Sequence, residues 1–400
     1  MMDKVILNEK LQQAVQLLNE QNIDMWLIFV RESSVNHDPA LDIVVGANVT
    51  WHSAFIIEKT GESTAIIGSL DFENIQEKSP FQYIITYVSS FEEKFVPLLQ
   101  EKSPKNIAIN YSLDSNIADG LSHGMYITLE KHIKDSGITT ELVSAEHIIA
   151  ALKGRKSPSE IANMKLAIAE AEKIFDSVTE FLKNDDISEQ DVANFVLGKV
   201  QAVGLELAWD PDHCPAVYSG PENAGAHSSP TTNKVLKGHI INMDFGVKVN
   251  NYCSDLQRTW YILRDGETEA PEEALRGFKI LREAIDNAAS TLKPGVRGVD
   301  VDTAARTHIT ENGYGEYKHG LGHQVGTNVH DGGVGLYPAW PRYGNLPMRL
   351  IEKDLVFTIE PRLFVENYGT VTVEEMYVVT ENGCSPISQQ QKELWLVSRG

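Results

Sequence analysis

The first 150 residues alternate between helical and strand-like hydrophobic patterns. Leu11, Val15 and Leu18 recur at helical spacing, which predicts a helix over residues 8–22. Strand-like apolar runs predict five strands, over residues 25–30, 56–57, 65–67, 84–88 and 107–109, of which 25–30 is the longest uninterrupted apolar run. Strands that alternate with helices indicate an α/β domain in this part of the chain.

The chain is expected to divide near residue 155. Residues 153–156 form a short basic connector, and Ser157 and Glu160 then provide the chemistry of a helix start. A length of 400 residues exceeds what one hydrophobic core usually organises. We therefore expect two domains, 1–150 and 156–400.

The second part also alternates helical and strand-like segments. Its predicted helices begin at Ser157 and Ser188 and cover residues 271–292 and 299–312. Its predicted strands are residues 240–249, 252–261, 355–360 and 370–380. Seven of the twelve histidines lie between His213 and His330, so the candidate chemistry is sought there.

Composition and charge exclude several classes of protein. Acidic residues outnumber basic ones, 56 to 35, and the net charge is −21. Such a chain repels nucleic-acid phosphates and acidic membranes, so neither is expected as a partner. Three cysteines without paired spacing argue against a disulfide framework, and no signal-peptide pattern is seen. A cytoplasmic protein is expected.

Two aspartates lie in a predicted β-hairpin. Asn250 and Asn251 tolerate the positive φ angles of a two-residue turn. This turn would place Asp244 opposite Gln257, with Asp255 as a diagonal neighbour on the same face. Each aspartate alone would more often be a strand-end or turn carboxylate, whereas a shared face in an apolar hairpin indicates a metal site.

Further candidate ligands follow along the chain. Two glycines between His319 and His323 disfavour the helical two-histidine zinc motif and allow an ion or substrate to come close. Glu360 ends an apolar strand before a proline. Glu374 and Glu375 lie in a β-branched strand, where neighbours face opposite sides, so one of them faces the site.

This set of ligands is rich in oxygen and contains no thiolate. It suits Mn²⁺, Fe²⁺, Co²⁺ or Zn²⁺ at a hydrolytic site better than a structural zinc site. Two divalent ions balance four carboxylates, whereas one ion would leave excess negative charge in a buried place. We expect two divalent ions, with manganese preferred and cobalt, zinc or iron as alternatives.

Five motifs connect these residues to a known family: NMDFG (242–246), YCSDLQRT (252–259), HGLGHQVG (319–326), TIEP (358–361) and VEE (373–375). In this order they resemble the metal-dependent Xaa-Pro peptidases, prolidase and aminopeptidase P, of the pita-bread family M24. The resemblance covers about residues 155–400 strongly and the first 150 residues only in layout. It implies an α+β protein, in which a C-terminal pita-bread fold follows a smaller creatinase-type α/β domain.

The resemblance also implies how five ligands would share two ions: Asp244 on one ion, His323 and Glu360 on the other, and Asp255 and Glu374 bridging both. Glu374 is preferred to Glu375 because the family's motif closes with Val-Thr, and aligning that pair with residues 379–380 places the family's glutamate at position 374. A hydroxide bridging the ions would attack the scissile carbonyl, and Glu360 would relay the proton.

Substrate groups are implied in the same way. His227, His319 and His330 match histidines that contact substrate, and His330 or His227 would stabilise the oxyanion. Prolidases tend to bind the dipeptide's carboxylate through an arginine, for which Arg342 or Arg349 would serve, although an exposed solvated arginine is the alternative.

Three departures from the family pattern bear on substrate choice. The family usually has glycine where this chain has Arg362, and it commonly has arginine where this chain has Thr372. Threonine is also common in place of Gln257.

The sequence therefore predicts a dinuclear-metal peptidase for short peptides with proline in second place, with a dipeptidase slightly preferred to an aminopeptidase. A homodimer is expected, in which the N-terminal domain covers the site or reaches the partner's cleft. Two alternatives stay open: a creatinase-like C–N hydrolase without metal, and a non-catalytic binding module on the same fold. Both predict loss of acidic ligands, and all of these are present.

Overall fold

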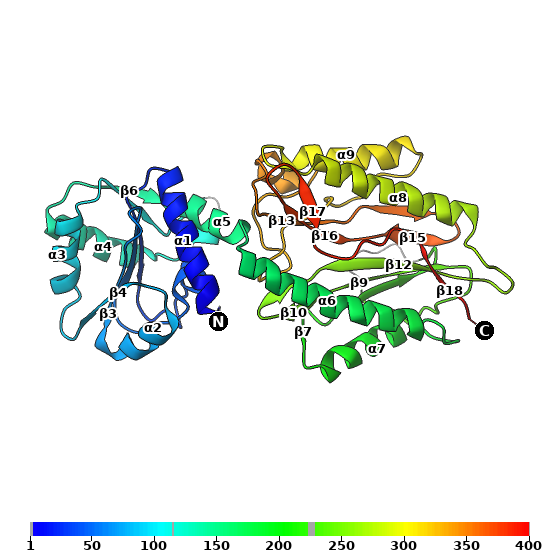
Figure 1. Cartoon of the computed structure of the whole chain (residues 1–400), viewed down its shortest axis with the longest axis horizontal. Coiled ribbons are helices and arrows are strands. Elements are labelled where there is room, and N and C mark those ends of the chain that lie inside the picture. The colour runs from blue at the N-terminus through cyan, green and yellow to red at the C-terminus, as the bar shows by residue number, and fades with distance from the viewer. Residues whose placement is uncertain (1–2, 114–115, 223–228, 400) are drawn as a thin grey trace. The chain divides into compact units, whose positions relative to one another are not determined.

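The computed structural model describes residues 3–113, 116–222 and 229–399 (Figure 1). The chain forms two compact units, Met1–Lys153 and Gly154–Gly400. Among the described residues, none of the helices combines the length and the apolar character that a membrane span requires.

The first unit is an α/β structure around a single sheet. Its helices are α1 (Lys4–Glu20), α2 (Phe72–Lys78), α3 (Glu92–Lys102), α4 (His123–Ser136) and α5 (Glu146–Gly154). Its strands are β1 (Met25–Val30), β2 (Ser53–Glu58), β3 (Ser63–Gly68), β4 (Tyr83–Tyr87), β5 (Asn106–Ile109) and β6 (Glu141–Ser144). The strand order is β4-β3-β2-β1-β5-β6, with β1 antiparallel to β2 and parallel to β5.

The central strand β1 is buried on both faces, as its continuous apolar run predicted. Alternate residues enter two cores: Trp26 packs with α1, and Leu27 packs with α3 and α4. The helix α1 begins at Lys4 rather than at residue 8. The reason is the N-cap Asp3, whose carboxylate accepts the Val5 N–H at 3.1 Å.

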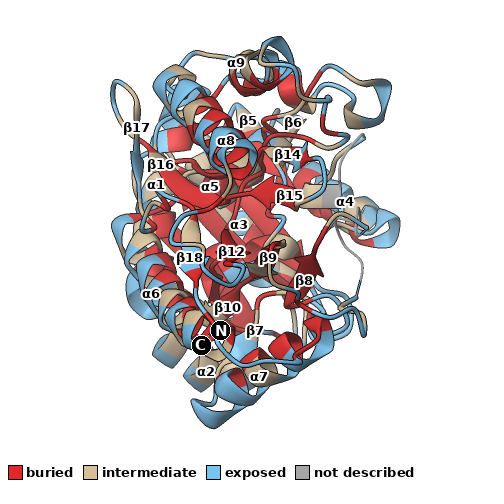
Figure 2. Ribbon diagram, turned by 90° about the vertical axis from the view of Figure 1, so that its right-hand side faces the viewer, coloured by how far each residue is buried: buried red, intermediate tan, exposed pale blue. Residues whose placement is uncertain are grey.

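The second unit places its strands between two pairs of helices (Figures 1 and 2). Its helices are α6 (Pro158–Phe181), α7 (Glu189–Ala202), α8 (Glu272–Thr291) and α9 (Gly298–Glu311). Its strands are β7 (Glu206–Leu207), β8 (Ala216–Ser219), β9 (Ile240–Phe245), β10 (Val247–Val249), β11 (Tyr252–Cys253), β12 (Leu256–Ile262), β13 (Val356–Ile359), β14 (Arg362–Val365), β15 (Gly369–Thr372), β16 (Glu375–Val379), β17 (Cys384–Pro386) and β18 (Trp395–Val397). Helices α6 and α7 pack against β8 and β10–β12, and α8 packs against β13–β15.

The strands of this unit form short sheets that together carry the buried core. The orders are β18-β12-β9-β8, β13-β16-β17, β11-β10-β7 and the pair β14-β15. In Figure 2 most of the central strands, such as β9 and β12, are coloured as buried, while the outer faces of the helices are exposed. The helix α7 begins at the predicted position with a capping box, in which Ser188 and Asp191 bond each other's backbone N–H groups.

Three strand predictions were wrong in the same way, because the structure interrupts long predicted strands. Residues 240–249 are broken at Gly246, where an added Cβ would lie 2.0 Å from the Ser254 carbonyl oxygen. Residues 252–261 are broken at 254–255, between β11 and β12, and residues 370–380 are broken at 373–374, between β15 and β16. All three breaks lie at or beside predicted metal ligands, so regular strand pairing is interrupted where the candidate site forms.

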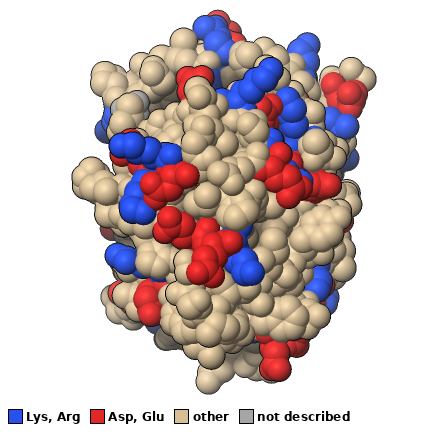
Figure 3. All heavy atoms as spheres, turned by 90° about the vertical axis from the view of Figure 1, so that its left-hand side faces the viewer, with Lys and Arg blue, Asp and Glu red and all other residues tan. Residues whose placement is uncertain are grey.

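The surface carries charges of both signs. On the face shown in Figure 3, lysine and arginine side chains lie among aspartates and glutamates, without a continuous basic area. This mixed pattern gives an anionic polymer no extended binding surface on that face.

Candidate active site

The hairpin between β10 and β11 has the predicted register. Asn250 and Asn251 have φ angles of 48° and 70°, and Val249 pairs with Tyr252. Farther along, Asp244 of β9 pairs with Gln257 of β12. These pairings confirm the two-residue turn, and the turn brings Asp255 to the same side as Asp244.

His323 lies on a stretch of chain that pairs with β13. Its N–H donates to Thr358 Oγ1 at 3.1 Å, and its carbonyl accepts the Thr358 N–H at 2.9 Å. At Gly322 an added Cβ would lie 2.0 Å from the Thr358 carbonyl oxygen. The glycine-rich sequence is therefore needed for close approach of two backbones, which places His323 next to Glu360 at the end of β13.

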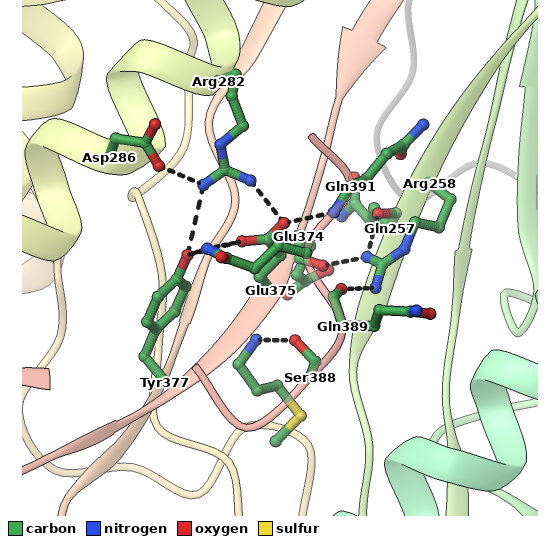
Figure 4. A network of polar contacts seen from close by, with 12 residues as sticks. Gln257, Arg258, Arg282, Asp286, Glu374, Glu375, Tyr377, Ser388, Gln389 and Gln391 are labelled. Carbon is green, nitrogen blue, oxygen red and sulfur yellow. Dashed lines mark hydrogen bonds and ion pairs between the residues drawn. The ribbon is translucent and has the colours of Figure 1, made fainter. Parts of the chain in front are cut away.

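The break between β15 and β16 separates two adjacent glutamates. Glu374 turns toward the side that holds Asp255 and His323, and its backbone pairs with Gln257 through an isolated bridge. Glu375 turns to the other side, where its carboxylate accepts from Arg282 at 2.6 Å and from the Tyr377 hydroxyl at 2.6 Å (Figure 4).

The carbonyl oxygens near the break are held by a buried arginine. Arg258 donates to the carbonyls of Glu374 at 2.8 Å, of Gln257 at 2.9 Å and of Gln389 at 2.7 Å (Figure 4). These three bonds fix the backbone that carries Glu374, because the planar guanidinium donates in set directions.

The predicted ligands converge on one place. Asp255, His323 and Glu374 each offer a ligand atom, and these atoms all lie within 4.8 Å of one another. His323 Nε2 lies 3.5 Å from Asp255 Oδ2 and 3.3 Å from Glu360 Oε1. Asp244 lines the same cavity. Residues more than 100 positions apart in sequence thus form one cluster.

The buried carboxylates of this cluster repel one another, and bound cations would stabilise their charged forms. Burial and then Glu360 raise the pKa of Asp244 well above its ordinary value. Burial and the neighbouring carboxylates likewise raise the pKa of Asp255 and of Glu374. Burial also acts to raise the pKa of Glu360, but the hydrogen bond of His323 and the charges of His323, His319 and His330 together outweigh it, and the pKa is lowered.

Two oxygens in the cluster lack partners. Asp244 Oδ1 and Glu374 Oε1 are buried without a hydrogen-bond donor among the described residues. Unpartnered buried carboxylate oxygens are costly unless an ion coordinates them. Together with the oxygen-rich donor set, they show that the cluster fits divalent cations of the kind expected.

The cluster lies in a cavity of about 310 Å³ in the second unit. Its lining comprises acids, histidines, aromatic rings, other polar groups and one arginine: Trp209, Tyr218, Asn242, Asp244, Asp255, Gln257, His319, Gly320, His323, Val329, His330, Tyr337, Tyr343, Glu360, Arg362, Thr372 and Glu374. The cavity therefore combines a charged cluster with an aromatic wall.

Two of the three predicted substrate histidines line this cavity. The His319 Nδ1 atom lies 2.7 Å from the Gly320 carbonyl, which can only accept, so Nδ1 carries the proton. Burial lowers the pKa of His319, which favours its neutral form. His330 lies edge-on to His323, with ring centroids 4.3 Å apart. The third candidate, His227, lies outside the described residues.

The predicted arginine does not line the cavity. Arg342 is exposed, donates to the Lys318 carbonyl at 2.6 Å and stacks on Trp340. Arg349 is exposed as well. The arginine that lines the cavity is Arg362, which sequence reasoning noted only as a departure from the family pattern. The sequence signal for Arg362 was its position two residues after Glu360, since residues two apart in a strand face the same side.

Comparisons with known proteins identify the family of this chain. Residues 162–381 match the sequence model of metallopeptidase family M24. An uncharacterized peptidase of Staphylococcus haemolyticus is 29% identical over 349 residues, 85% of this chain and 88% of that protein. The Xaa-Pro dipeptidase of Pyrococcus horikoshii is 26% identical over 392 residues, 97% of this chain and 99% of that protein.

A solved structure shows the same fold. The X-Pro aminopeptidase from Thermotoga maritima superposes with a TM-score of 0.69 at 23% identity, over 96% of this chain and all of that one. This likeness confirms the expected fold class, an α+β protein with a pita-bread fold preceded by a smaller α/β domain.

Proposed function

This chain belongs to metallopeptidase family M24, and from that premise we propose that it hydrolyses the Xaa-Pro bond of short peptides, dipeptides before longer ones. The observation that carries the proposal is the convergence of Asp255, His323 and Glu374, with Asp244 and Glu360, in one cavity. The names of the relatives, an Xaa-Pro dipeptidase and an X-Pro aminopeptidase, support the proline specificity.

The proposed cofactor is a pair of divalent ions, manganese before cobalt, zinc or iron. Asp244 would hold one ion, His323 and Glu360 the other, and Asp255 and Glu374 both. Such ions supply an acidified water and a Lewis acid for the scissile carbonyl. The orphaned oxygens of Asp244 and Glu374 and the raised pKa values support this assignment.

Glu360 is proposed as the group that moves the proton. The lowered pKa keeps its carboxylate ionised, and His323 and Thr358 hold it at 3.3 Å and 3.4 Å. A carboxylate so placed accepts a proton from the attacking water and passes it to the proline nitrogen, which leaves as a secondary amine.

The histidines have separate proposed roles. With Nδ1 bonded to Gly320, His319 presents an unprotonated Nε2, which accepts a hydrogen bond from a substrate N–H. His330, beside His323, is proposed to donate to the developing oxyanion. His227 is proposed to contact substrate by its place in the sequence motif alone.

The aromatic wall suits a proline ring. Trp209, Tyr218, Tyr337 and Tyr343 line the cavity and offer apolar faces to a small, rigid ring. An Xaa-Pro bond has no N–H, so recognition must come from ring shape rather than from that donor.

The proposal extends to the whole chain. Since the lining residues run from Trp209 to Glu374, residues 156–400 are proposed as the catalytic domain and residues 1–150 as an accessory domain. A homodimer in a reducing cytoplasm is proposed from the resemblance and from the three unpaired cysteines. Light scattering of the purified protein tests the dimer.

The experiment compares Gly-Pro, Gly-Pro-Pro and Gly-Leu as substrates of metal-stripped protein, with and without added Mn²⁺. Cleavage of Gly-Pro alone, restored by metal, is expected. Cleavage of Gly-Pro-Pro as well would assign an aminopeptidase instead. Metal binding without cleavage of either proline peptide would contradict the proline specificity.

The two alternatives from the sequence are not favoured. A metal-independent C–N hydrolase and a non-catalytic module both predict eroded acidic ligands, whereas the acids are present and lie together. Metal-dependent turnover in the same experiment separates the proposed function from both.

A further inference from the structure

A second row of polar side chains lies next to the predicted metal ligands. In β9, Asn242 precedes Asp244 by two residues, and both line the cavity. The register pairs Asn242 with Tyr218 of β8 and with Thr259 of β12. The row continues into β15, where the Thr372 N–H donates to Thr259 Oγ1 at 3.3 Å.

Arg362 completes this row. The register of β14 and β15 pairs it directly with Thr372, so two departures from the family pattern face each other. Its guanidinium donates to Thr370 Oγ1 at 3.3 Å and lies 5.9 Å from the ring centroid of Tyr218. Among the described residues that line the cavity, it is the single lysine or arginine.

Within the described part of the chain, the guanidinium of Arg362 has no acidic counter-charge. No carboxylate of the described residues forms an ion pair with Arg362, and the two contacts named above use only part of its five donors. A half-buried cation without an acid is costly, and a carboxylate that accepts two parallel N–H bonds would satisfy it. If divalent ions neutralise the four acids that line the cavity, the positive charge of Arg362 is left without compensation.

The distance between the predicted metal ligands, represented by Asp244, and the polar row, represented by Asn242, limits where the substrate's carboxylate can lie. Asn242 and Asp244 are two residues apart on one strand, about 6.7 Å. One residue of substrate and one hydrogen bond to an arginine together span about 6.5 Å. A carboxylate one residue beyond the scissile carbonyl therefore reaches the row of Arg362, whereas that of a tripeptide would lie about 3.5 Å farther on.

We propose that Arg362 binds a carboxylate of the substrate; this assignment rests on the proposed function and refines it. The carboxylate has two possible sources, the C-terminus of an Xaa-Pro dipeptide and an acidic side chain before proline. The spacing of the rows favours the C-terminus and hence a dipeptidase.

The test measures kcat/KM for two pairs of substrates that differ in one carboxylate. The first pair is Gly-Pro and Gly-Pro amide, and the second is Glu-Pro amide and Gln-Pro amide. Wild-type protein, Arg362→Gln and Arg342→Gln are compared after loading with Mn²⁺. Binding of L-proline and of L-prolinamide by calorimetry gives a readout that does not depend on turnover.

Arg362→Gln is expected to lower the preference for Gly-Pro over Gly-Pro amide by about 10- to 100-fold, the worth of one charge-assisted pair. The preference for L-proline over L-prolinamide should fall in parallel. If the preference for Glu-Pro amide over Gln-Pro amide falls instead, Arg362 still binds a carboxylate, and its source is the side chain.

Other outcomes overturn the inference. Unchanged ratios for both pairs would show that Arg362 binds no substrate carboxylate, and a change caused only by Arg342→Gln would assign that role to Arg342. If the wild-type protein binds Mn²⁺ but cleaves none of the four peptides, the proposed function itself fails.

The cross-strand register provides a rescue that keeps the test informative if Arg362→Gln folds poorly. In the double variant Arg362→Thr with Thr372→Arg, the guanidinium approaches the cavity from the opposite strand of the pair. Partial recovery of the preference for Gly-Pro is expected, and a fold-neutral double variant without recovery would contradict the proposal.

Discussion

Two adjacent glutamates, Glu374 and Glu375, have different predicted roles because their side chains point to opposite sides of the chain. Glu374 is 1% exposed and faces the acidic cluster, with Oε1 unpartnered among the described residues. Glu375 is fully buried on the other side and is bonded to Arg282 and Tyr377. The same residue type is thus a predicted ligand at one position and half of a buried ion pair at the next.

Glu374→Gln is expected to lower activity by at least about 100-fold, because it removes a predicted bridging ligand. Without metal it should not lower the melting temperature, since it removes a carboxylate whose charged form is disfavoured by burial. Activity assays and thermal unfolding in EDTA measure the two effects. A large loss of stability without metal would contradict this view of the cluster.

Glu375→Gln provides the matched comparison. It leaves Arg282 without its buried partner, which costs about 3–5 kcal/mol of unfolding free energy whether or not metal is present. Urea denaturation with and without Mn²⁺ measures this loss. Equal sensitivity of the two variants to metal would show that the two glutamates do not have the separate roles assigned here.

At the scale of elements, short interruptions position the site. The turn at Asn250 and Asn251 sets which face Asp255 occupies, and the break before β16 turns Glu374 inward. Neighbouring side chains of a strand alternate between its two faces, so the register of the turn and the break before β16 decide which acids reach the site. At these irregular positions the backbone conformation restricts which residue types can be present.

Asn251 tests the geometry of the turn. Its φ of 70° lies in the left-handed region, where a residue with a Cβ and no local hydrogen bonding is strained. Asn251→Ala is expected to lower the unfolding free energy by about 1 kcal/mol, whereas Asn251→Gly should not lower it. Urea denaturation compares them, and equal losses would argue against the left-handed turn.

At the scale of the whole molecule, the acidic cluster links metal binding to stability. The raised pKa values of Asp244, Asp255 and Glu374 mean that the metal-free protein loses stability as pH rises above the ordinary carboxyl range near 4. An ion that binds only the folded state opposes this loss.

Added Mn²⁺ is therefore expected to raise the melting temperature of metal-stripped protein, with a larger gain at pH 8 than at pH 5. Thermal unfolding at both pH values, with Mg²⁺ as a second ion, measures the effect. A rise in melting temperature that does not depend on pH would show that the ions do not bind through the buried carboxylates.

The first unit has its own dependence on pH. Burial lowers the pKa of His52 and of His132. Since the unfolded chain then binds protons more readily, stability is present above about pH 6.5 and is lost as pH falls toward the folded pKa values. Glu92 acts against this shift at His132, while Lys131 adds to it.

Hydrogen exchange in β1 and α4, corrected for the intrinsic rate, is expected to increase between pH 7 and pH 5. His132→Phe should reduce that increase, because the ring packs against Phe29, Phe91 and Phe95 and a phenylalanine cannot titrate there. Equal protection at both pH values would contradict the prediction.

The sequence by itself indicated the type of many elements and most of the candidate site residues. The strand β1, the capping box at Ser188 and the register of the hairpin follow from local periodicity and turn chemistry, which a single segment encodes. The family motifs identified Asp244, Asp255 and His323 as candidates before any contact was known.

Only the tertiary structure decided which residues share the cavity. It brought Arg362 into the lining rather than Arg342, and it paired Arg362 with Thr372 across two strands. It also interrupted the strands at Gly246 and before β16. These features depend on contacts between distant segments, whose packing and desolvation local periodicity does not encode.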